Sequence, residues 1–353
     1  MSDIIIKLKG GAGNQLFQAI AALSLAKIYG KHCRFSSENI NKNKYKRKLE
    51  ILPLLNELKV LEHLKIENKN IIYLDQYDID HPIYFSENSP LSKLKTDIQI
   101  EGYFSNYRIH NKEVFKKIKS HIKGRNIIQK FRDLNYIAIH IRELHGTGKN
   151  KINNSIDNLN IEYYSKCLYK IFQNNSNQKL NTAIVFSDTW KNPEKSSLIP
   201  KVKNLLKNYG IKYINGDKEI SSTLDIVNIF SHSKFCIISN STLSWWGAYL
   251  SDGIVFSPVM NIWEPNLKVP DSWNQIYSNE INLKTHHKKS IFETCVLKEK
   301  AYNNRIYNTK RLKVIKFSRL IRNKVNSTNI YIKFKRWLRS KGVFPENSYT
   351  TFV

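Results

Sequence analysis

The first thirty residues constrain the fold more than any other stretch of this chain. Residues 3–9 form a short β-branched run that ends in the turn Gly10-Gly11-Ala12-Gly13, and apolar residues at helical spacing follow through Tyr29. This pattern predicts a strand, a glycine turn and a helix packed on a sheet. Glycines let a ligand approach the backbone, and a helix start offers unpaired N–H groups and a positive dipole end. The unit therefore favours a phosphorylated ligand, although a tight strand–helix turn alone also explains the glycines.

Two amides, Asn14 and Gln15, follow that turn directly. Asparagine is a poor residue for a helix interior, so amides at this place need a specific partner. Their presence strengthens the prediction of a binding site at the helix start.

The size and composition of the chain are those of a soluble globular protein that is long enough for two domains. It has 353 residues, of which 41% are hydrophobic, and no apolar run approaches the 18 residues of a membrane span. The start, Met1-Ser2-Asp3, lacks the features of a secretory signal, which predicts a cytoplasmic protein. Four scattered cysteines without Cys-x-x-Cys spacing are expected to be reduced, metal-free core residues; they are Cys33, Cys167, Cys236 and Cys295.

The C-terminal residues 284–353 are strongly basic. They hold 18 lysine and arginine residues against three acidic ones, which is more than half of the net charge of +28. Within them, 310–324 and 330–338 mix cations with leucine, isoleucine, phenylalanine and tryptophan, which is typical of a helix lying on an anionic lipid surface. A merely solvated tail is the alternative. Binding to nucleic acid is not expected, because no recognised motif accompanies the charge.

Strands alternate with helices along most of the chain, which predicts parallel sheets built from βαβ units. We divide the chain into two α/β domains, 1–133 and 134–283, followed by the basic tail. The expected strands are 4–8, 71–74, 98–103, 136–142, 182–186, 211–214, 235–239 and 253–256, and the expected helices are 161–172, 201–209, 223–230 and one starting at 244. Alternation in 136–142 places three isoleucines on one strand face, opposite Ala138, His140 and Arg142.

Polar groups end three strands of the second half: His140 and Arg142, Asp188, and the run Ser239-Asn240-Ser241-Thr242. Ligands of parallel α/β sheets bind at the carboxyl ends of strands. A guanidinium there forms a forked contact with phosphate, worth about 1.5–3 kcal/mol. The bland alternatives are an arginine paired with a carboxylate, a buried core histidine and a helix N-cap. Trp245-Trp246, just beyond, is expected to be core.

Some motif matches are weak. The segment 146–149, GTGK, lacks the first glycine of a P-loop and the hydroxyl residue after its lysine. Asp78-Ile79-Asp80 has a metal-binding form but lies in an expected turn. Glu143 and Asp188 are candidate bases, and nothing in their spacing selects either one.

Several segments together resemble the alpha-1,2-fucosyltransferase family, and more distantly alpha-1,6- and protein O-fucosyltransferases. The resemblance covers about residues 4–283. The segments that carry it are 10–30 (GGAGNQLFQAIAALSLAKIYG), 101–107 (EGYFSNY), 161–164 (IEYY), 186–188 (FSD) and 239–248 (SNSTLSWWGA).

The resemblance implies a GT-B architecture, in which two Rossmann-like domains face a cleft and the second binds GDP-fucose without a metal or other cofactor. It implies that Arg142 holds the β-phosphate, that His140 and Asp188 hold the guanosine, and that Ser241 and Thr242 touch the diphosphate. Ser239 and Asn240 belong to the same site, and Gly13 and Asn14 face it from the first domain.

The chain departs from the family at one place. The usual motif is His-x-Arg-Arg-Gly-Asp, whereas this chain has His140-Ile141-Arg142-Glu143-Leu144. We therefore take Arg142 and Glu143 as the candidate catalytic residues, with a new role for the glutamate.

The expected reaction is inverting transfer of L-fucose to a hydroxyl, the 2-OH of a galactoside, in a surface-glycan precursor such as a lipid-linked O-antigen intermediate. Its expected partners are GDP-fucose, an oligosaccharide acceptor and, through the tail, the inner membrane face. The alternatives are another GDP-sugar donor and a binding-only relic without turnover.

Overall fold

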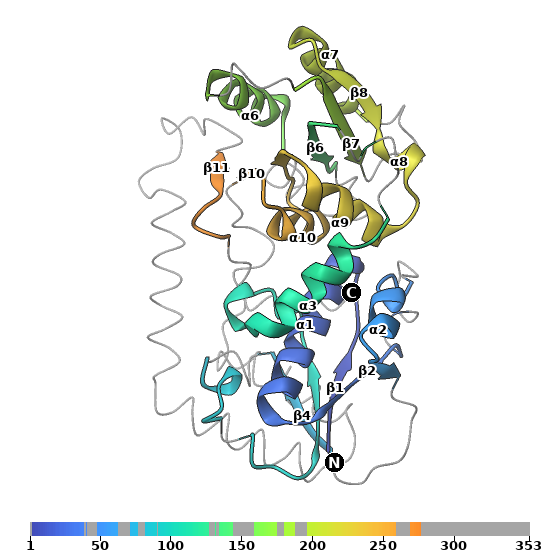
Figure 1. The fold of residues 1–353 in the computed structure, drawn as a ribbon, viewed down its shortest axis with the longest axis vertical. Helices are drawn as coiled ribbons and strands as arrows, with labels where there is room; N and C mark the ends of the chain where they lie inside the picture. The colour runs from blue at the N-terminus through green and yellow to red at the C-terminus, as the bar shows by residue number, and fades with distance from the viewer. Residues whose placement is uncertain are drawn as a thin grey trace, which may run out of the picture.

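The computed structural model shows two α/β halves that follow one another along the long axis (Figure 1). The structure describes residues 2–38, 40, 48–62, 71–76, 82–89, 91–126, 131, 134–143, 159–174, 180–187, 196–258 and 269–276. The basic tail, Asp188, and the segments around Asp78 and Gly146 lie outside them.

The first half is a parallel sheet in the order β3-β2-β1-β5-β4. Its strands are β1 (Asp3–Lys7), β2 (His32–Ser36), β3 (Leu61–Glu62), β4 (Ile71–Asp75) and β5 (Asp97–Glu101). Its helices are α1 (Ala12–Tyr29), α2 (Leu52–Glu57) and α3 (Lys112–Lys123), with 3-10 turns η1 (Pro82–Phe85) and η2 (Tyr107–Ile109).

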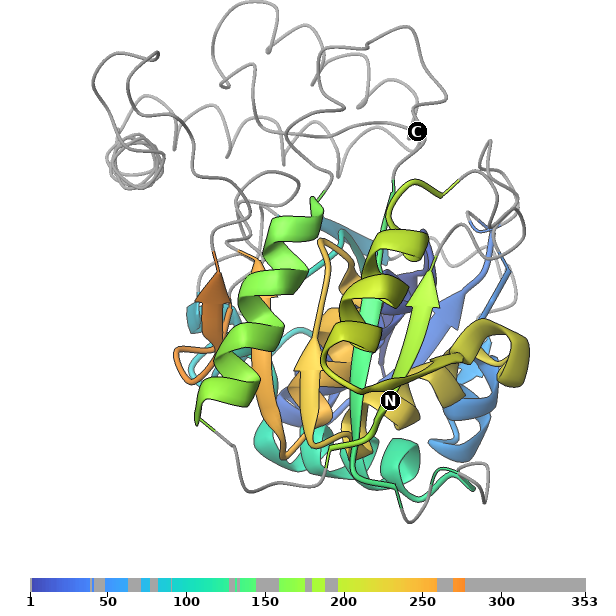
Figure 2. The same ribbon diagram turned by 90° about the horizontal axis from the view of Figure 1, so that it is seen from above.

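The second half is a parallel sheet in the order β11-β10-β9-β6-β7-β8. Its strands are β6 (Tyr136–Ile141), β7 (Thr182–Ser187), β8 (Lys212–Asn215), β9 (Phe235–Ile237), β10 (Ile254–Pro258) and β11 (Asn274–Ile276). Its helices are α6 (Ile161–Asn174), α7 (Ile199–Asn208), α8 (Gly216–Glu219), α9 (Thr223–His232) and α10 (Thr242–Leu250). Figure 2 shows α6 and α7 lying over one face of this sheet.

Strand β6 confirms the predicted alternation. Ile137, Ile139 and Ile141 belong to the apolar cluster that includes α6 and α7. Tyr136 and Ala138 point the other way, into the cluster that includes α9, α10 and the first half. The α/β class and the parallel sheets are therefore as predicted, and β6 is buried on both faces, as is usual for a strand of a parallel sheet covered by helices.

Helix α1 is buried on almost every side, since it packs on β1 and against α10. It ends at Gly30, whose φ of 61° is the left-handed conformation that glycine adopts at helix ends. The buried Gln15 and Gln18 bind loop backbone: Gln18 pairs with both backbone groups of Lys9, while Gln15 donates to Gly10 and Lys48. The predicted need for a partner at Gln15 is thus met by the protein itself.

The two halves meet where α1 and α3 contact α9 and α10, which we call the seam. Aromatic rings fill its centre: Phe17 of α1 lies 4.7 Å from Trp245 and 4.8 Å from Trp246, centroid to centroid. Both tryptophans are fully buried, as expected of core residues. One apolar cluster therefore runs from the first sheet through the seam to the second.

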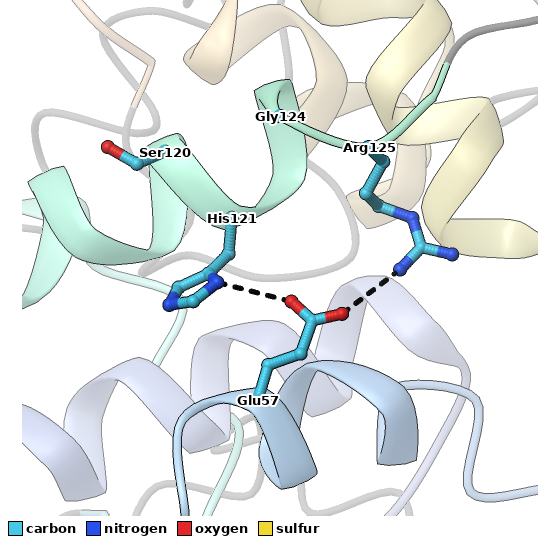
Figure 3. A pocket seen from close by; sticks show the side chains of 5 residues that line it. All are labelled: Glu57, Ser120, His121, Gly124 and Arg125. Carbon is cyan, nitrogen blue, oxygen red and sulfur yellow. Dashed lines mark ion pairs between the residues drawn. The ribbon is translucent and has the colours of Figure 1, made fainter.

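Ion pairs border the seam. Arg125, after α3, binds Asp225 of α9 at 2.7 Å and approaches Glu57 of α2 at 3.7 Å, while His121 Nδ1 lies 3.2 Å from the same glutamate. These groups line a shallow hollow, and Figure 3 shows the Glu57 carboxylate between the two basic side chains. The hollow lies beside α2, and the Glu57 carboxylate in it already pairs with His121 and Arg125.

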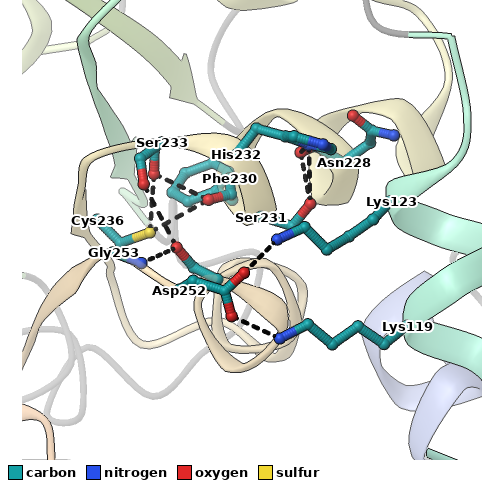
Figure 4. A network of polar contacts seen from close by, with 11 residues as sticks. Lys119, Lys123, Asn228, Phe230, Ser231, His232, Ser233, Cys236, Asp252 and Gly253 are labelled. Carbon is teal, nitrogen blue, oxygen red and sulfur yellow. Dashed lines mark hydrogen bonds and ion pairs between the residues drawn. The ribbon is translucent and has the colours of Figure 1, made fainter. Parts of the chain in front are cut away.

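Asp252, just after α10, also links the two halves. Lys119 and Lys123 of α3 both bind its carboxylate, at 2.7 and 2.6 Å (Figure 4). These bonds, from Lys119 first, lower the pKa of Asp252 to about 2. Because its pKa is lower in the folded protein, the Asp252 carboxylate stabilises the fold at pH values above its unfolded pKa of 3.8. This stabilisation is lost as the pH falls through 2.

We expect Asp252→Asn to lower the free energy of unfolding by at most about 1 kcal/mol at pH 7, because the carboxylate is exposed. The difference from wild type should vanish near pH 2. Urea unfolding of both proteins across pH 2–7 measures it, and a constant difference down to pH 2 would contradict the assignment.

Candidate functional site

The ends of β6 and β9 bring the predicted polar residues together. The two strands are neighbours, with Ile139 opposite Ile237, so His140 and Ser239 follow at the same carboxyl edge. His140 Nδ1 lies 2.6 Å from the Ser239 hydroxyl, and this hydrogen bond joins the two strand ends. Arg142 follows β6 directly and is half-buried. On the other side of β6, Ile141 pairs with Ser187, the last residue before Asp188.

His140 is a buried, neutral imidazole. Burial, and then the nearby Arg142 guanidinium, lower its pKa to about 3. Its ring packs edge-on against Phe230. The backbone oxygen of His140 accepts a bond from the Tyr164 hydroxyl. The imidazole therefore positions Ser239 and carries no charge of its own at neutral pH.

A second neutral histidine, His110, stacks on Trp246 in the seam with centroids 5.5 Å apart. Burial lowers its pKa to about 3. Among the described residues, neither of its ring nitrogens has a hydrogen-bond partner.

Both histidines must gain a proton on unfolding below pH 6.5, so acid should destabilise the fold. We expect the free energy of unfolding to fall by about 1.4 kcal/mol per pH unit for each histidine as the pH drops from 6.5 towards 3. Urea titrations of wild type, His140→Asn and His110→Asn measure the contribution of each. Equal slopes in all three proteins would contradict the neutral assignment.

Helix α10 begins at the same edge. Ser241 is its N-cap in extended conformation, and the Ser241 carbonyl accepts the first helical bond, from Trp245 N–H at 3.0 Å. The Ser241 side chain makes no capping bond, and no acidic residue lies in the first turn. Such a helix start favours an anion. Asn240 and Thr242 are half-buried on either side of the cap.

Gly13 of α1 lies directly against the start of α10. A Cβ at Gly13 would stand 2.4 Å from the Thr242 carbonyl carbon and 2.6 Å from its hydroxyl oxygen. Gly13 therefore lets two helix starts from different halves touch, which the sequence did not predict. Asn14 is half-buried, and its amide lies beside Gly10.

Glu143 is bound by the segment before α7. Its buried carboxylate accepts a hydrogen bond from the Ser196 hydroxyl. It also accepts bonds from the N–H and from the hydroxyl of Ser197, both at 3.0 Å. These bonds fix the segment that leads into α7. The catalytic role of Glu143 stays a prediction, and these contacts give its carboxylate a structural task.

Two polar residues near the helix starts were not predicted, Glu50 and Thr223. The Thr223 hydroxyl, at the start of α9, donates to the Glu50 carboxylate at 2.6 Å. No local sequence signal marks the pair, because 173 positions separate its members. The Gln15 side-chain oxygen accepts a hydrogen bond from the Glu50 N–H, a contact that only the folded structure reveals.

The chain is similar to known glycosyltransferases in sequence, and weakly in structure. No family model matches the chain. It is 23% identical over 316 residues to an alpha-1,2-colitosyltransferase of Escherichia coli, covering 78% of this chain and 99% of that protein. Among solved structures, POFUT1 in complex with GDP has a TM-score of 0.43 at 12% identity, covering 70% of this chain and 95% of that one. Fucosyltransferase NodZ from Bradyrhizobium has a TM-score of 0.43 at 13% identity, with 71% and 94% covered.

The predicted resemblance to a fucosyltransferase-like family is confirmed by the match to the curated transferase, which spans almost all of that relative. The architecture agrees with it, since each half has a parallel α/β sheet, as the two Rossmann-like domains of the prediction require.

Proposed function

We propose that this chain is an inverting glycosyltransferase that moves L-fucose from GDP-fucose to a hydroxyl group, the 2-OH of a galactoside in a surface-glycan precursor. The hydrogen bond between His140 and Ser239 is the observation that carries the proposal, because it sets Arg142 and the α10 start at one sheet edge. The alpha-1,2-colitosyltransferase relative supports glycosyl transfer with an alpha-1,2 linkage.

In this proposal the reaction is a single displacement. An acceptor hydroxyl attacks the anomeric carbon while GDP departs, and negative charge develops on the β-phosphate. Arg142 and the N–H groups at the start of α10 stabilise that charge more in the transition state than in the ground state. Asp188, expected at the guanosine, lies outside the described residues.

A glycan-array transfer assay with GDP-fucose, run with and without a chelator, tests donor, acceptor and metal independence together. The expected result is equal transfer in both. GDP binding without transfer to any acceptor would favour a binding-only relic, and loss of transfer in the chelator would overturn the metal-free mechanism.

The name of the relative favours a second donor sugar, colitose. Fucose carries a 3-hydroxyl that colitose lacks, so a site built to bind this hydroxyl discriminates strongly between the two. Competing GDP-fucose and GDP-colitose in one reaction measures the preference. A higher kcat/KM for GDP-colitose would replace fucose by colitose and leave the rest of the proposal in place.

We propose in addition that residues 284–353 hold the enzyme on the inner membrane face, where a lipid-linked acceptor lies. No helix in the described part of the chain is long and apolar enough to span a bilayer. At about 1 kcal/mol per engaged cation, six cations give roughly 6 kcal/mol, enough for reversible docking. Equal flotation of the protein with anionic and with neutral liposomes at low salt would overturn this.

A further inference from the structure

The proposed displacement needs a group that takes the proton of the acceptor hydroxyl, and the inference here depends on that proposed reaction. Carboxylates that link the two halves are the natural candidates. Asp225 and Asp252 are both in ion pairs with cations of the first half. An adjacent cation stabilises the charged carboxylate and weakens it as a base. The Glu143 carboxylate already accepts hydrogen bonds from two serines before α7, and this places it in a structural role.

Glu50 differs from all three. Its backbone is fixed from within the first half, because its N–H donates to the buried Gln15 Oε1 at 2.9 Å. Gln15 also donates to the Lys48 carbonyl at 2.8 Å, which holds the loop before α2 on the first turn of α1. The glutamate is therefore placed by a buried amide on a rigid helix.

The Glu50 carboxylate is oriented from the second half. Its Oε2 accepts the bond from Thr223 at the start of α9. Its Oε1 lies 3.9 Å from the position of a Cβ on Gly11, the N-cap of α1. In the described part of the chain, Oε1 has no hydrogen-bond or ion-pair partner, and the residue is half-buried. One oxygen is thus fixed and the other is available to a substrate hydroxyl.

The position suits a base acting from the acceptor side. Gly11 lies two residues before Gly13, whose backbone contacts Thr242 at the start of α10. Glu50 therefore belongs to the first half, whereas the helix start that would hold the departing diphosphate belongs to the second. In an inverting displacement the base acts on the face of the sugar opposite the leaving group, so a sugar held between the two halves would present these two faces to Glu50 and to the start of α10.

We propose that Glu50 is the catalytic base, with Thr223 as its positioning residue. The acceptor O–H bond breaks and its proton goes to Glu50 Oε1. The acceptor oxygen forms the bond to the anomeric carbon. The bond from that carbon to the β-phosphate oxygen breaks, and its electron pair leaves with GDP.

Glu50→Gln tests the proposal, because the amide oxygen still accepts from Thr223 but cannot accept a proton. We expect kcat for transfer to fall at least about 100-fold, as for loss of a general base. The dissociation constant for GDP should stay within about twofold and the Tm within about 2 °C, since no donor contact and no ion pair is lost. The decline of wild-type kcat towards acidic pH should be absent in the variant. Glu113→Gln, the same change on an exposed glutamate of α3, is the matched control.

Thr223→Val separates proton transfer to Glu50 from the positioning of Glu50, because it removes the Thr223 hydroxyl and keeps the Glu50 carboxylate. We expect a fall in kcat of less than about tenfold, with the acidic limb of the pH profile retained. Glu50→Asp should restore that limb at a reduced rate.

Equal losses in Glu50→Gln and Thr223→Val, or a Glu50→Gln protein that transfers at the wild-type rate, would overturn the role of Glu50 and leave the proposed function standing. A wild-type protein that transfers neither fucose nor colitose would overturn the proposed function itself.

Discussion

Gly13→Ala is expected to destabilise the protein by about 1–3 kcal/mol or more, because overpacking against a rigid neighbour is costly. The added Cβ would stand 2.4 and 2.5 Å from backbone atoms of Thr242 and Leu243, which cannot rotate away as a side chain can. Relief requires α1 and α10 to separate. That movement would disturb the aromatic contact between Phe17 and the two tryptophans of α10.

Gly11→Ala is the matched control, since it lies in the same turn with a negative φ of −81°. Among the described residues, its Cβ would meet only the Glu50 carboxylate, at 3.9 Å. We expect a loss below about 1 kcal/mol, the cost of alanine at an N-cap. Urea unfolding compares the two variants. Equal stabilities would show that the α1–α10 contact is absent in solution.

Gly13→Ala should also reduce the rate of transfer. A displacement of about 1 Å in a positioning element costs on the order of 100-fold in rate. We expect Gly13→Ala, assayed well below its Tm, to lose that much kcat/KM with GDP-fucose. Gly11→Ala serves as the control for stability only, because its added methyl would lie 3.9 Å from Glu50 Oε1.

The elements of the second half were predictable because their patterns are strong. The side chains of strand β6 alternate between two apolar clusters, and α7 and α9 have apolar residues at helical spacing. The observed ends of these elements therefore differ from the predicted ones by only a few residues. Strand β11 was missed, since 253–256 was expected to be the last strand. It has three residues of mixed polarity and gains its place from pairing with β10, which no local pattern records.

In the first half, β2 and α3 were not singled out. Strand β2 has the sequence His-Cys-Arg-Phe-Ser and is stabilised by its pairing with β1. The pairing includes an ion pair in which Arg34 Nε lies 2.5 Å from the Asp3 carboxylate. Helix α3 belongs to the first half by sequence, but its lysines and Ile122 contact the second. Such contacts depend on how the halves meet, and neither half encodes that alone.

The predicted site shows the same division. His140, Arg142, Ser239 and the α10 cap were predictable because parallel strands place their ends at one edge. The neutrality of His140 was not, since burial on a folded sheet lowers its pKa. The engagement of Glu143 by Ser196 and Ser197 was equally hidden, because both serines precede a helix whose packing sets their position.

Arg142→Ala is expected to lower kcat/KM for transfer by about 100- to 1,000-fold, the usual effect of removing one donor that stabilises developing charge. The guanidinium follows β6 beside the buried His140, and its charge is one cause of the lowered pKa of that imidazole. The His140–Ser239 bond does not involve the guanidinium, so we expect it to stay in place in Arg142→Ala.

Arg142→Lys should recover only part of the loss, because an ammonium keeps the charge but cannot form two parallel bonds to a phosphate. Arg108→Ala, on an exposed arginine of η2, is the surface control and should transfer at the wild-type rate. GDP binding by calorimetry, measured alongside the kinetics, separates donor affinity from the chemical step. A larger fall in kcat than in GDP affinity would place the contact in the transition state, whereas full transfer by Arg142→Ala would exclude the guanidinium from the reaction.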